Sequence, residues 1–247
     1  MNINALIKYW ILMLITLTQF NVAFSQNPRE KQDFAFNTRK SPTIGVKGGV
    51  LLSTVTGDEA IDQFAKKIGP QLGVTGALYV HPMLSFRGEL NYESKGGKFS
   101  NQEMTMNLNY ISLPVYMKFN FTRDPEIYIY GGGYASYLFS ASTKGQYEII
   151  IGNDNIYQDI NEDILDNLNK IDVGLVVGAG VQGRYNRSID IFIDFRYTQG
   201  FINLDNNNAE YRYNFNYEPF WPEQDFDKPK NKAMMLTIGI IYYLIPR

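Results

Sequence analysis

Apolar and polar residues alternate along most of this chain, and a period of two is the pattern of a β-strand with one apolar face. The clearest stretch runs from Leu84 to Glu93, where Phe86 and Leu90 lie on one face and charged residues lie on the other. Three more stretches are equally regular: residues 109–121, 172–185 and 189–198. Three less regular stretches and a last strand bring the expected number to eight: residues 43–52, 71–80, 127–140 and 233–244.

The connections between these strands alternate in length. The long ones are residues 53–70, 96–107, 141–171 and 202–232, and the short ones are 81–82, 122–126 and 186–188. Barrels of the outer membrane have short periplasmic turns and long extracellular loops, and tilted strands of about 9–11 residues cross the bilayer. We therefore expect an all-β fold, an eight-stranded antiparallel up-and-down transmembrane β-barrel with both termini in the periplasm.

The first residues have the layout of a cleavable secretory signal. Lys8 precedes an apolar run over residues 9–17, and Ala23 and Ser25 are small residues at the positions that signal peptidase reads. An uncleaved anchor is the alternative, but the apolar run is shorter than the roughly 20 residues that a membrane-spanning helix needs. We expect a signal peptide over residues 1–25, a flexible periplasmic leader over 26–42 and the barrel over 43–247.

The polar face of each strand is expected to face the barrel interior. An eight-stranded barrel is just wide enough for side chains to fill it, and charges of both signs can pair there. A lumen filled in this way predicts a plugged barrel rather than a diffusion pore. The expected lumen charge network is Arg87, Glu89, Glu93, Lys118, Asp172, Arg184, Asp190, Asp194 and Arg196.

Aromatic residues make up 15% of the chain and cluster near the expected strand ends. Membrane barrels place such residues in two belts at the interfaces, whereas in the alternative they are core residues of a soluble β-protein. The belt at the short turns is expected to contain Tyr79, Phe119, Phe121, Tyr128 and Tyr185. The belt at the long loops is expected to contain Tyr92, Tyr110, Phe139, Tyr197 and Phe201.

Composition narrows the available chemistry. The chain has no cysteine, one histidine and a net charge of -2, which excludes disulfides and thiolate sites and provides no global attraction for nucleic acid. His81 lies in a short turn, so histidine-based catalysis is not expected. Residues 178–183 match G-x-G-x-x-G, but a strand rather than a helix follows, so we expect no nucleotide cofactor. Catalysis by carboxylates alone stays open for Glu89, Glu93, Asp190 and Asp194.

Two long loops carry distinctive residues. In the third, Ile160, Ile164 and Leu168 predict a short amphipathic helix on the barrel rim, and the acidic residues lack the spacing of a calcium loop, so no metal is expected. The last loop concentrates aromatic residues, which either mark a contact surface or fold back as a lid. The expected partner-contact residues are Tyr211, Tyr213, Phe215, Tyr217, Phe220 and Trp221.

Several segments resemble the PorT-type outer-membrane β-barrel family. They are residues 44–53, 88–97, 108–114, 172–174, 178–180 and the strand end at 197–200. The resemblance extends over residues 43–244, and its motifs are structural. It implies an outer-membrane barrel, and the named family member implies a role in exporting proteins to the cell surface. One departure is the C-terminal Leu244-Ile245-Pro246-Arg247, where such barrels commonly end on an aromatic residue.

These patterns lead to two expected functions. The first is a non-enzymatic outer-membrane barrel that serves as a scaffold, a surface-interaction element or a protein-secretion accessory, with the lipid bilayer and other envelope or secretion proteins as partners. The alternative is a barrel that binds a small ligand or forms a narrow channel, with space provided by the glycines near residues 71–80 and 127–140.

Overall fold

The computed structural model describes residues 41–56, 64–99, 104–122, 124–151, 154–204, 206 and 229–245. These ranges contain the strands β1 (Thr43–Thr56), β2 (Phe64–His81), β3 (Leu84–Phe99), β4 (Met104–Asn120), β5 (Glu126–Ile151), β6 (Asp154–Asp163), β7 (Ile171–Arg184), β8 (Ile189–Gly200) and β9 (Lys230–Tyr243). A 3-10 turn, η2 (Leu165–Asn167), follows β6. No helix in these ranges is long and apolar enough to cross a membrane. The expected signal peptide, nearly all of the leader and the aromatic residues of the last loop lie outside them.

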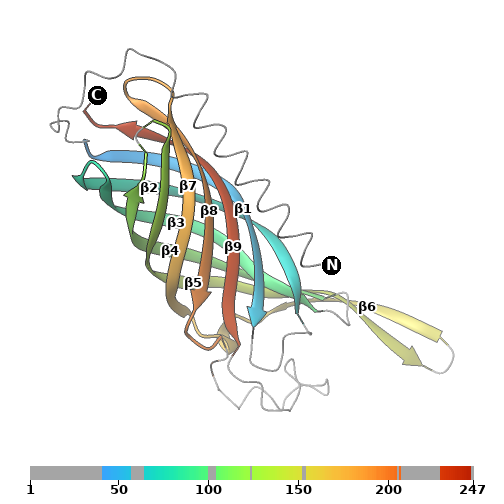
Figure 1. The fold of residues 1–247 in the computed structure, drawn as a ribbon. Coiled ribbons are helices and arrows are strands. Elements are labelled where there is room, and N and C mark those ends of the chain that lie inside the picture. The colour runs from blue at the N-terminus through green and yellow to red at the C-terminus, as the bar shows by residue number, and fades with distance from the viewer. Residues whose placement is uncertain are drawn as a thin grey trace, which may run out of the picture. The chain divides into compact units, whose positions relative to one another are not determined.

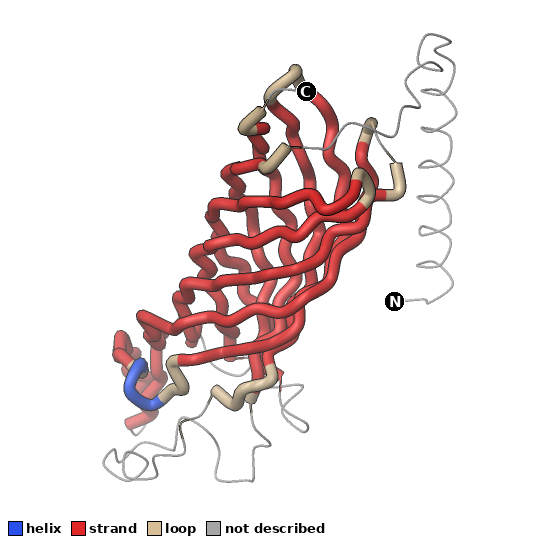
Figure 2. Tube along the Cα trace, turned by 90° about the vertical axis from the view of Figure 1, so that its left-hand side faces the viewer, coloured by secondary structure: helices blue, strands red, loops and turns tan. Residues whose placement is uncertain are grey.

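Eight of the strands form one closed antiparallel sheet (Figures 1 and 2). Neighbours pair in the order β4-β3-β2-β1-β9-β8-β7-β5, and β4 also pairs with β5, which closes the ring. The first and last strands pair along their whole length, from Thr43 opposite Tyr243 to Thr56 opposite Lys230. The predicted eight-stranded antiparallel barrel is thus confirmed.

The strands extend further toward the long loops than the sequence pattern predicts. β5 continues to Ile151 and pairs with β6, which has no other neighbour among the described strands, so a two-stranded hairpin projects beyond the barrel wall (Figure 1). The third long loop is therefore mostly strand, and the predicted amphipathic helix is wrong. Isoleucine-rich segments favour extended structure, and Ile149 lies opposite Ile156 in this hairpin. Only the 3-10 turn remains helical, and it is flanked by the buried Ile164 and Leu168.

The barrel wall is apolar outside and polar inside, the reverse of a water-soluble protein. Val46, Leu78 and Val115 point outward with 58%, 63% and 61% of their surface exposed. Lys118 and Arg196 point inward with 0% and 1% exposed. An outer surface of this kind is stable in hydrocarbon, where a closed barrel also leaves no backbone group unpaired at an edge.

The aromatic residues divide between the two surfaces. Phe119, Phe121 and Phe139 are exposed on the outer wall, as an interfacial belt requires. The predicted belt residues Tyr110 and Tyr128 are fully buried inside the barrel, and Tyr79 faces the same interior, where it packs against the cluster that contains Phe192. The physical reason is strand parity, because each of them alternates with outward residues on its own strand.

The interior tolerates no added bulk at Gly132, which lies on β5 next to β4. A Cβ on Gly132 would lie 2.2 Å from the Val115 carbonyl oxygen, whereas one on the outward-facing Gly133 would meet no atom closer than 3.5 Å. We expect Gly132→Val to lower the free energy of unfolding by about 1–3 kcal/mol through overpacking. Gly133→Val is the matched control and should unfold at the wild-type urea concentration in detergent micelles. Equal midpoints for the two variants would contradict this packing.

Candidate functional site

The barrel interior is the candidate site because it gathers most of the predicted charge network. The structure buries eight of the nine predicted residues inside, with at most 6% of their surface exposed: Arg87, Glu89, Glu93, Lys118, Asp172, Asp190, Asp194 and Arg196. The prediction that Arg184 lies inside the lumen is wrong. Arg184 shares their strand face but lies at the end of β7, where its half-exposed side chain is 3.8 Å from Asp124. Alternation assigns a face to a residue, not the point along the strand where the interior ends.

Glu89 on β3 is the centre of the network. Its carboxylate accepts two hydrogen bonds from the Arg196 guanidinium, at 2.8 and 2.9 Å. Lys47 on β1 and Tyr116 on β4 donate to the same carboxylate, and Asn91 donates from 3.0 Å. This single side chain therefore ties four strands together, and the bidentate pair has the geometry of the strongest charge-assisted hydrogen bonds.

Two tyrosine rings lie next to Arg196. Its guanidinium carbon lies 5.3 Å from the Tyr116 ring centroid and 5.4 Å from that of Tyr130, and the two rings stack at 4.4 Å. The Tyr130 hydroxyl accepts a hydrogen bond from Nε of Arg196 and donates one to Asp194, at 3.0 and 2.6 Å. Carboxylates and π faces together replace the water that this cation loses on burial.

A second group of polar side chains lies toward the short turns. The Gln182 side-chain oxygen accepts a hydrogen bond from Lys118 at 2.7 Å, and its amide nitrogen donates to Asp190 at 2.8 Å. The Tyr243 hydroxyl donates to the same carboxylate at 2.7 Å. Lys118 also lies 3.5 Å from Glu126. One glutamine of β7 thus links a basic residue of β4 with an acidic residue of β8.

A third group lies toward the long loops. Glu93 pairs with Lys95 at 3.0 Å, and the Lys95 ammonium lies 4.9 Å from the Tyr134 ring centroid. Asp172 accepts hydrogen bonds from the Tyr134 hydroxyl at 3.1 Å and from the Asn231 amide at 3.0 Å. The network therefore continues along the length of the lumen.

Charges of the two signs balance within the described part of the lumen. The buried basic residues are Lys47, Lys67, Arg87, Lys95, Lys118 and Arg196, and the buried acidic residues are Glu89, Glu93, Glu126, Asp172, Asp190 and Asp194. Sequence reasoning missed four of these twelve. Strand parity would have identified Lys47, which alternates with Ile44 and Val46. Lys95 lies on the same face as Glu93, but it is two residues beyond the point where the regular alternation ends, because β3 continues further than the pattern predicts.

Apolar side chains cover the polar interior at both ends. At the long-loop end, nine buried residues form one cluster: Val55, Met106, Leu108, Tyr110, Leu138, Ala141, Ile164, Leu168 and Leu204. At the short-turn end, Phe192, Ile241 and Tyr243 form another, with Tyr79 packed against it. Apolar clusters therefore lie at both ends of the charged interior, and the cluster at the short-turn end is in contact with polar groups such as Asp190.

The G-x-G-x-x-G stretch has a packing role. It lies entirely within β7, and no helix begins there. A Cβ on Gly178 would lie 2.3 Å from the Tyr130 ring, and one on Gly180 would lie 2.5 Å from the Tyr128 hydroxyl. These glycines make room for the tyrosines of β5. Over the described ranges, no group of three or more histidine or carboxylate residues is placed to hold a metal ion.

Removing the charge of Glu89 tests the network. Glu89→Gln keeps the size of the side chain but leaves Arg196 and Lys47 buried without this carboxylate, so we expect a loss of about 3–5 kcal/mol in the free energy of unfolding. Asp166→Asn breaks the exposed pair with Lys170 and should cost less than about 0.5 kcal/mol. Urea unfolding in detergent measures both.

Adding Lys47→Met to Glu89→Gln restores the charge balance and should recover part of the lost stability. A Glu89→Gln variant as stable as Asp166→Asn would show that the network contributes little.

Solved structures with a similar strand arrangement come from several bacteria. The outer membrane protein OprG of Pseudomonas aeruginosa is 12% identical, with a TM-score of 0.45, and the match covers 83% of this chain and 96% of that one. Neisserial surface protein A is 12% identical, with a TM-score of 0.42 and coverages of 81% and 97%. Ail, the attachment invasion locus protein of Yersinia pestis, is 13% identical, with a TM-score of 0.40 and coverages of 82% and 99%. Such low identity limits the likeness to the strand arrangement.

No curated protein sequence matches the chain. The family described as "Outer membrane protein beta-barrel domain" matches residues 24–206, which is most of the sequence. The closed strand ring, its apolar outer wall and this match agree: the chain belongs to the outer membrane protein beta-barrel domain family and lies in the lipid bilayer of the outer membrane.

Proposed function

We propose that this barrel is a non-enzymatic, non-conducting protein that acts at the cell surface, as a scaffold or as an accessory of protein secretion. The observation that carries the proposal is the interior, which is filled by buried charged side chains and by an apolar cluster at each end. With the lumen occupied by its own side chains, the segments at the barrel ends are what the protein offers to partners. The resemblance to the PorT-type family supports the secretion role.

The proposal includes an orientation with both termini in the periplasm. A signal peptide over residues 1–25 is removed, residues 26–42 form a leader, and residues 43–247 form the barrel domain. The support is that β1 begins opposite the end of β9, at Thr43 and Tyr243, on the side of the barrel where the short turns lie. The long connections then face the exterior, as they do in other barrels of this membrane.

Two segments on the long-loop side are suited to contact other envelope or secretion proteins. The hairpin of β5 and β6 carries a strand whose only described strand neighbour is β5, and such an edge can accept an extended segment of a partner. The second segment is the last long loop with its aromatic residues, Tyr211, Tyr213, Phe215, Tyr217, Phe220 and Trp221.

The environment of the candidate catalytic groups supports the absence of enzymatic activity. His81 is exposed at the end of β2, where its Nδ1 accepts a hydrogen bond from the backbone N–H of Met83. Glu89 and Glu93 are paired with basic residues, and Asp194 accepts a hydrogen bond from Tyr130. A carboxylate held in this way has no open side for a substrate.

The alternative, a ligand-binding or channel-forming lumen, requires space beside glycines. Gly73 and Gly132 face inward, but the atoms that a Cβ would meet lie 2.0 and 2.2 Å away, on Asn91 and Val115. Gly76 and Gly133 lie on the exposed side of the wall. The interior glycines therefore accommodate neighbouring atoms rather than a ligand.

Conductance in a planar bilayer tests the filled lumen. The refolded protein should produce no stable ion steps, because charged pairs and apolar layers occupy the path. A porin with about 16 strands, measured in the same bilayer, is the positive control. Large and stable steps from this protein would exclude the non-conducting proposal and favour the channel.

Deleting residues 208–222 tests the last loop. A backbone hydrogen bond from Leu204 N–H to the Pro229 carbonyl, at 2.7 Å, joins the two sides of this loop at its base, so the barrel should fold without the deleted residues. We expect partners captured on intact cells with a membrane-impermeant cross-linker to be lost. Replacing residues 100–103 by Gly and Ser is the control and should leave capture unchanged. Equal capture in all three proteins would remove the aromatic loop as a contact.

A further inference from the structure

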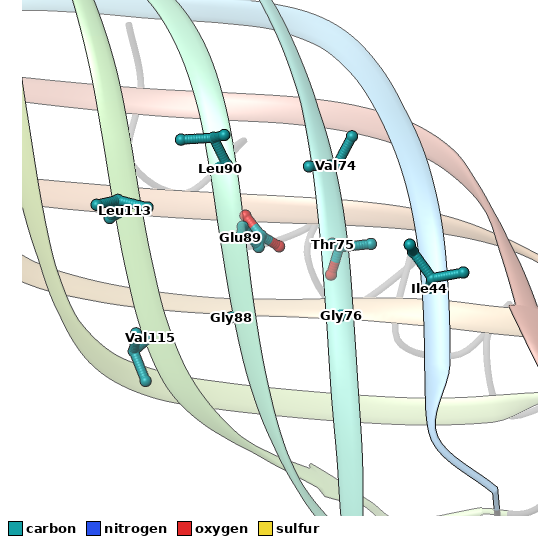
Figure 3. Close-up of a pocket in the computed structure, with 9 residues that line it drawn as sticks. All are labelled: Ile44, Val74, Thr75, Gly76, Gly88, Glu89, Leu90, Leu113 and Val115. Carbon is teal, nitrogen blue, oxygen red and sulfur yellow. The ribbon is translucent and has the colours of Figure 1, made fainter. Parts of the chain in front are cut away.

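The outer wall carries a depression of about 380 Å³ over β1 to β4 (Figure 3). At its centre Gly76 of β2 lies directly opposite Gly88 of β3. In the same row Gly76 pairs with Ile44, and Gly88 pairs with Val115. Two neighbouring positions of the wall therefore lack side chains, and aliphatic side chains stand on either side of them.

The floor of the depression is backbone and is open above. A Cβ on Gly88 would meet nothing within 4 Å, and one on Gly76 would come no closer than 3.7 Å to the Thr43 carbonyl oxygen. Thr75 and Glu89 adjoin these glycines in sequence, but their side chains are buried in the lumen. The backbone polar groups of the floor are engaged in the ladders with neighbouring strands.

The rim of the depression is entirely aliphatic. Ile44, Val74, Leu90, Leu113 and Val115 surround the two glycines in Figure 3. Between 47% and 61% of each of these residues is exposed. A rim with no charge and no hydrogen-bonding group selects an apolar occupant, and it gives a polar ligand or a headgroup nothing to bind.

The depth of the two glycines indicates which lipid supplies that occupant. Gly76 lies five residues before His81, and Gly88 lies four residues after Leu84, at the same short turn. Five residues of strand span about 17 Å along a tilted path, and the hydrocarbon core is about 30 Å thick. The depression is therefore in the half of the bilayer next to the short turns.

We propose that this depression binds one acyl chain of a phospholipid from the periplasmic leaflet. If the depression were empty, both the protein and the surrounding lipid would lose dispersion contacts there. A flexible acyl chain can bend into the depression and restore these contacts. A second protein would have to give up translational and rotational freedom to fill the same space, whereas lipid chains already surround the wall. The assignment to the periplasmic leaflet rests on the proposed orientation.

Photolabelling in vesicles tests the site. The full protein is reconstituted in phosphatidylcholine vesicles that contain a small fraction of a phospholipid with a mid-chain diazirine, and labelled peptides are identified by mass spectrometry. Labelling of residues 84–90 and 111–117 should exceed that of residues 175–181 on the opposite wall by about threefold or more, which corresponds to a preference of about 0.7 kcal/mol. Equal labelling of both walls would overturn the proposal.

Two glycine variants distinguish the effect of filling the depression from the effect of any added side chain on the outer wall. Gly88→Leu fills the depression, and its Cβ has open space, so the barrel should fold and the excess labelling should fall to the level of the opposite wall. Gly183→Leu is the matched control, because a Cβ there also meets nothing within 4 Å and the site is on β7. It should leave the labelling pattern unchanged.

Two further results would lead to different conclusions. A dimer that is present in the vesicles and is lost in Gly88→Leu would overturn the proposal in favour of a second copy of the chain as the occupant. Protease treatment of intact cells reports orientation independently of labelling. If labelling is enriched at the depression but the short turns are cut from outside, the depression binds an acyl chain of the outer leaflet. In that case only the proposed orientation is wrong.

Discussion

Backbone hydrogen bonding in hydrocarbon is the constraint on which the rest of this structure depends. No water is available within the bilayer to satisfy an exposed strand edge, so the sheet has to close on itself. Closure is achieved by two pairings, β1 with β9 and β4 with β5. With eight strands, the closed ring leaves an interior that side chains can fill. The charge network, the apolar layers and the outer groove all follow from that geometry.

The interior then has an electrostatic requirement of its own. Each charge buried there loses its hydration, and the loss is tolerable only when a partner of opposite sign is held at hydrogen-bonding distance. Glu89 meets this requirement for Arg196 and Lys47 together, and Glu93 meets it for Lys95. Arg87 and Lys67 are held by neutral groups instead, the Gln182 side chain and the Lys95 carbonyl, while the six basic and six acidic residues balance over the described lumen. A lumen arranged in this way holds the strands in register, and it leaves the two ends and the outer wall as the surfaces that meet other molecules.

Particular residues show how far the sequence could predict this site. Alternation placed Glu89, Lys118 and Arg196 on the inward face, since side chains on a strand point to opposite sides in turn. It put Arg184 inside although that residue lies at the open end of its strand, and it left out Lys95 because the regular pattern stops at Glu93 while β3 continues to Phe99. The partners within the lumen come from strands far apart in the sequence, so periodicity could not assign them.

The sequence by itself determined the fold class, the number of strands in the barrel and which face of each regular strand is apolar, because these depend on local periodicity and on the lengths of the connections. The tertiary structure decided the rest. The shared register of all eight strands sets which charges pair, where Ile164 and Leu168 cover the lumen, and that Gly76 comes to lie opposite Gly88. Those contacts join residues that are distant along the chain, and only closure of the barrel brings them together.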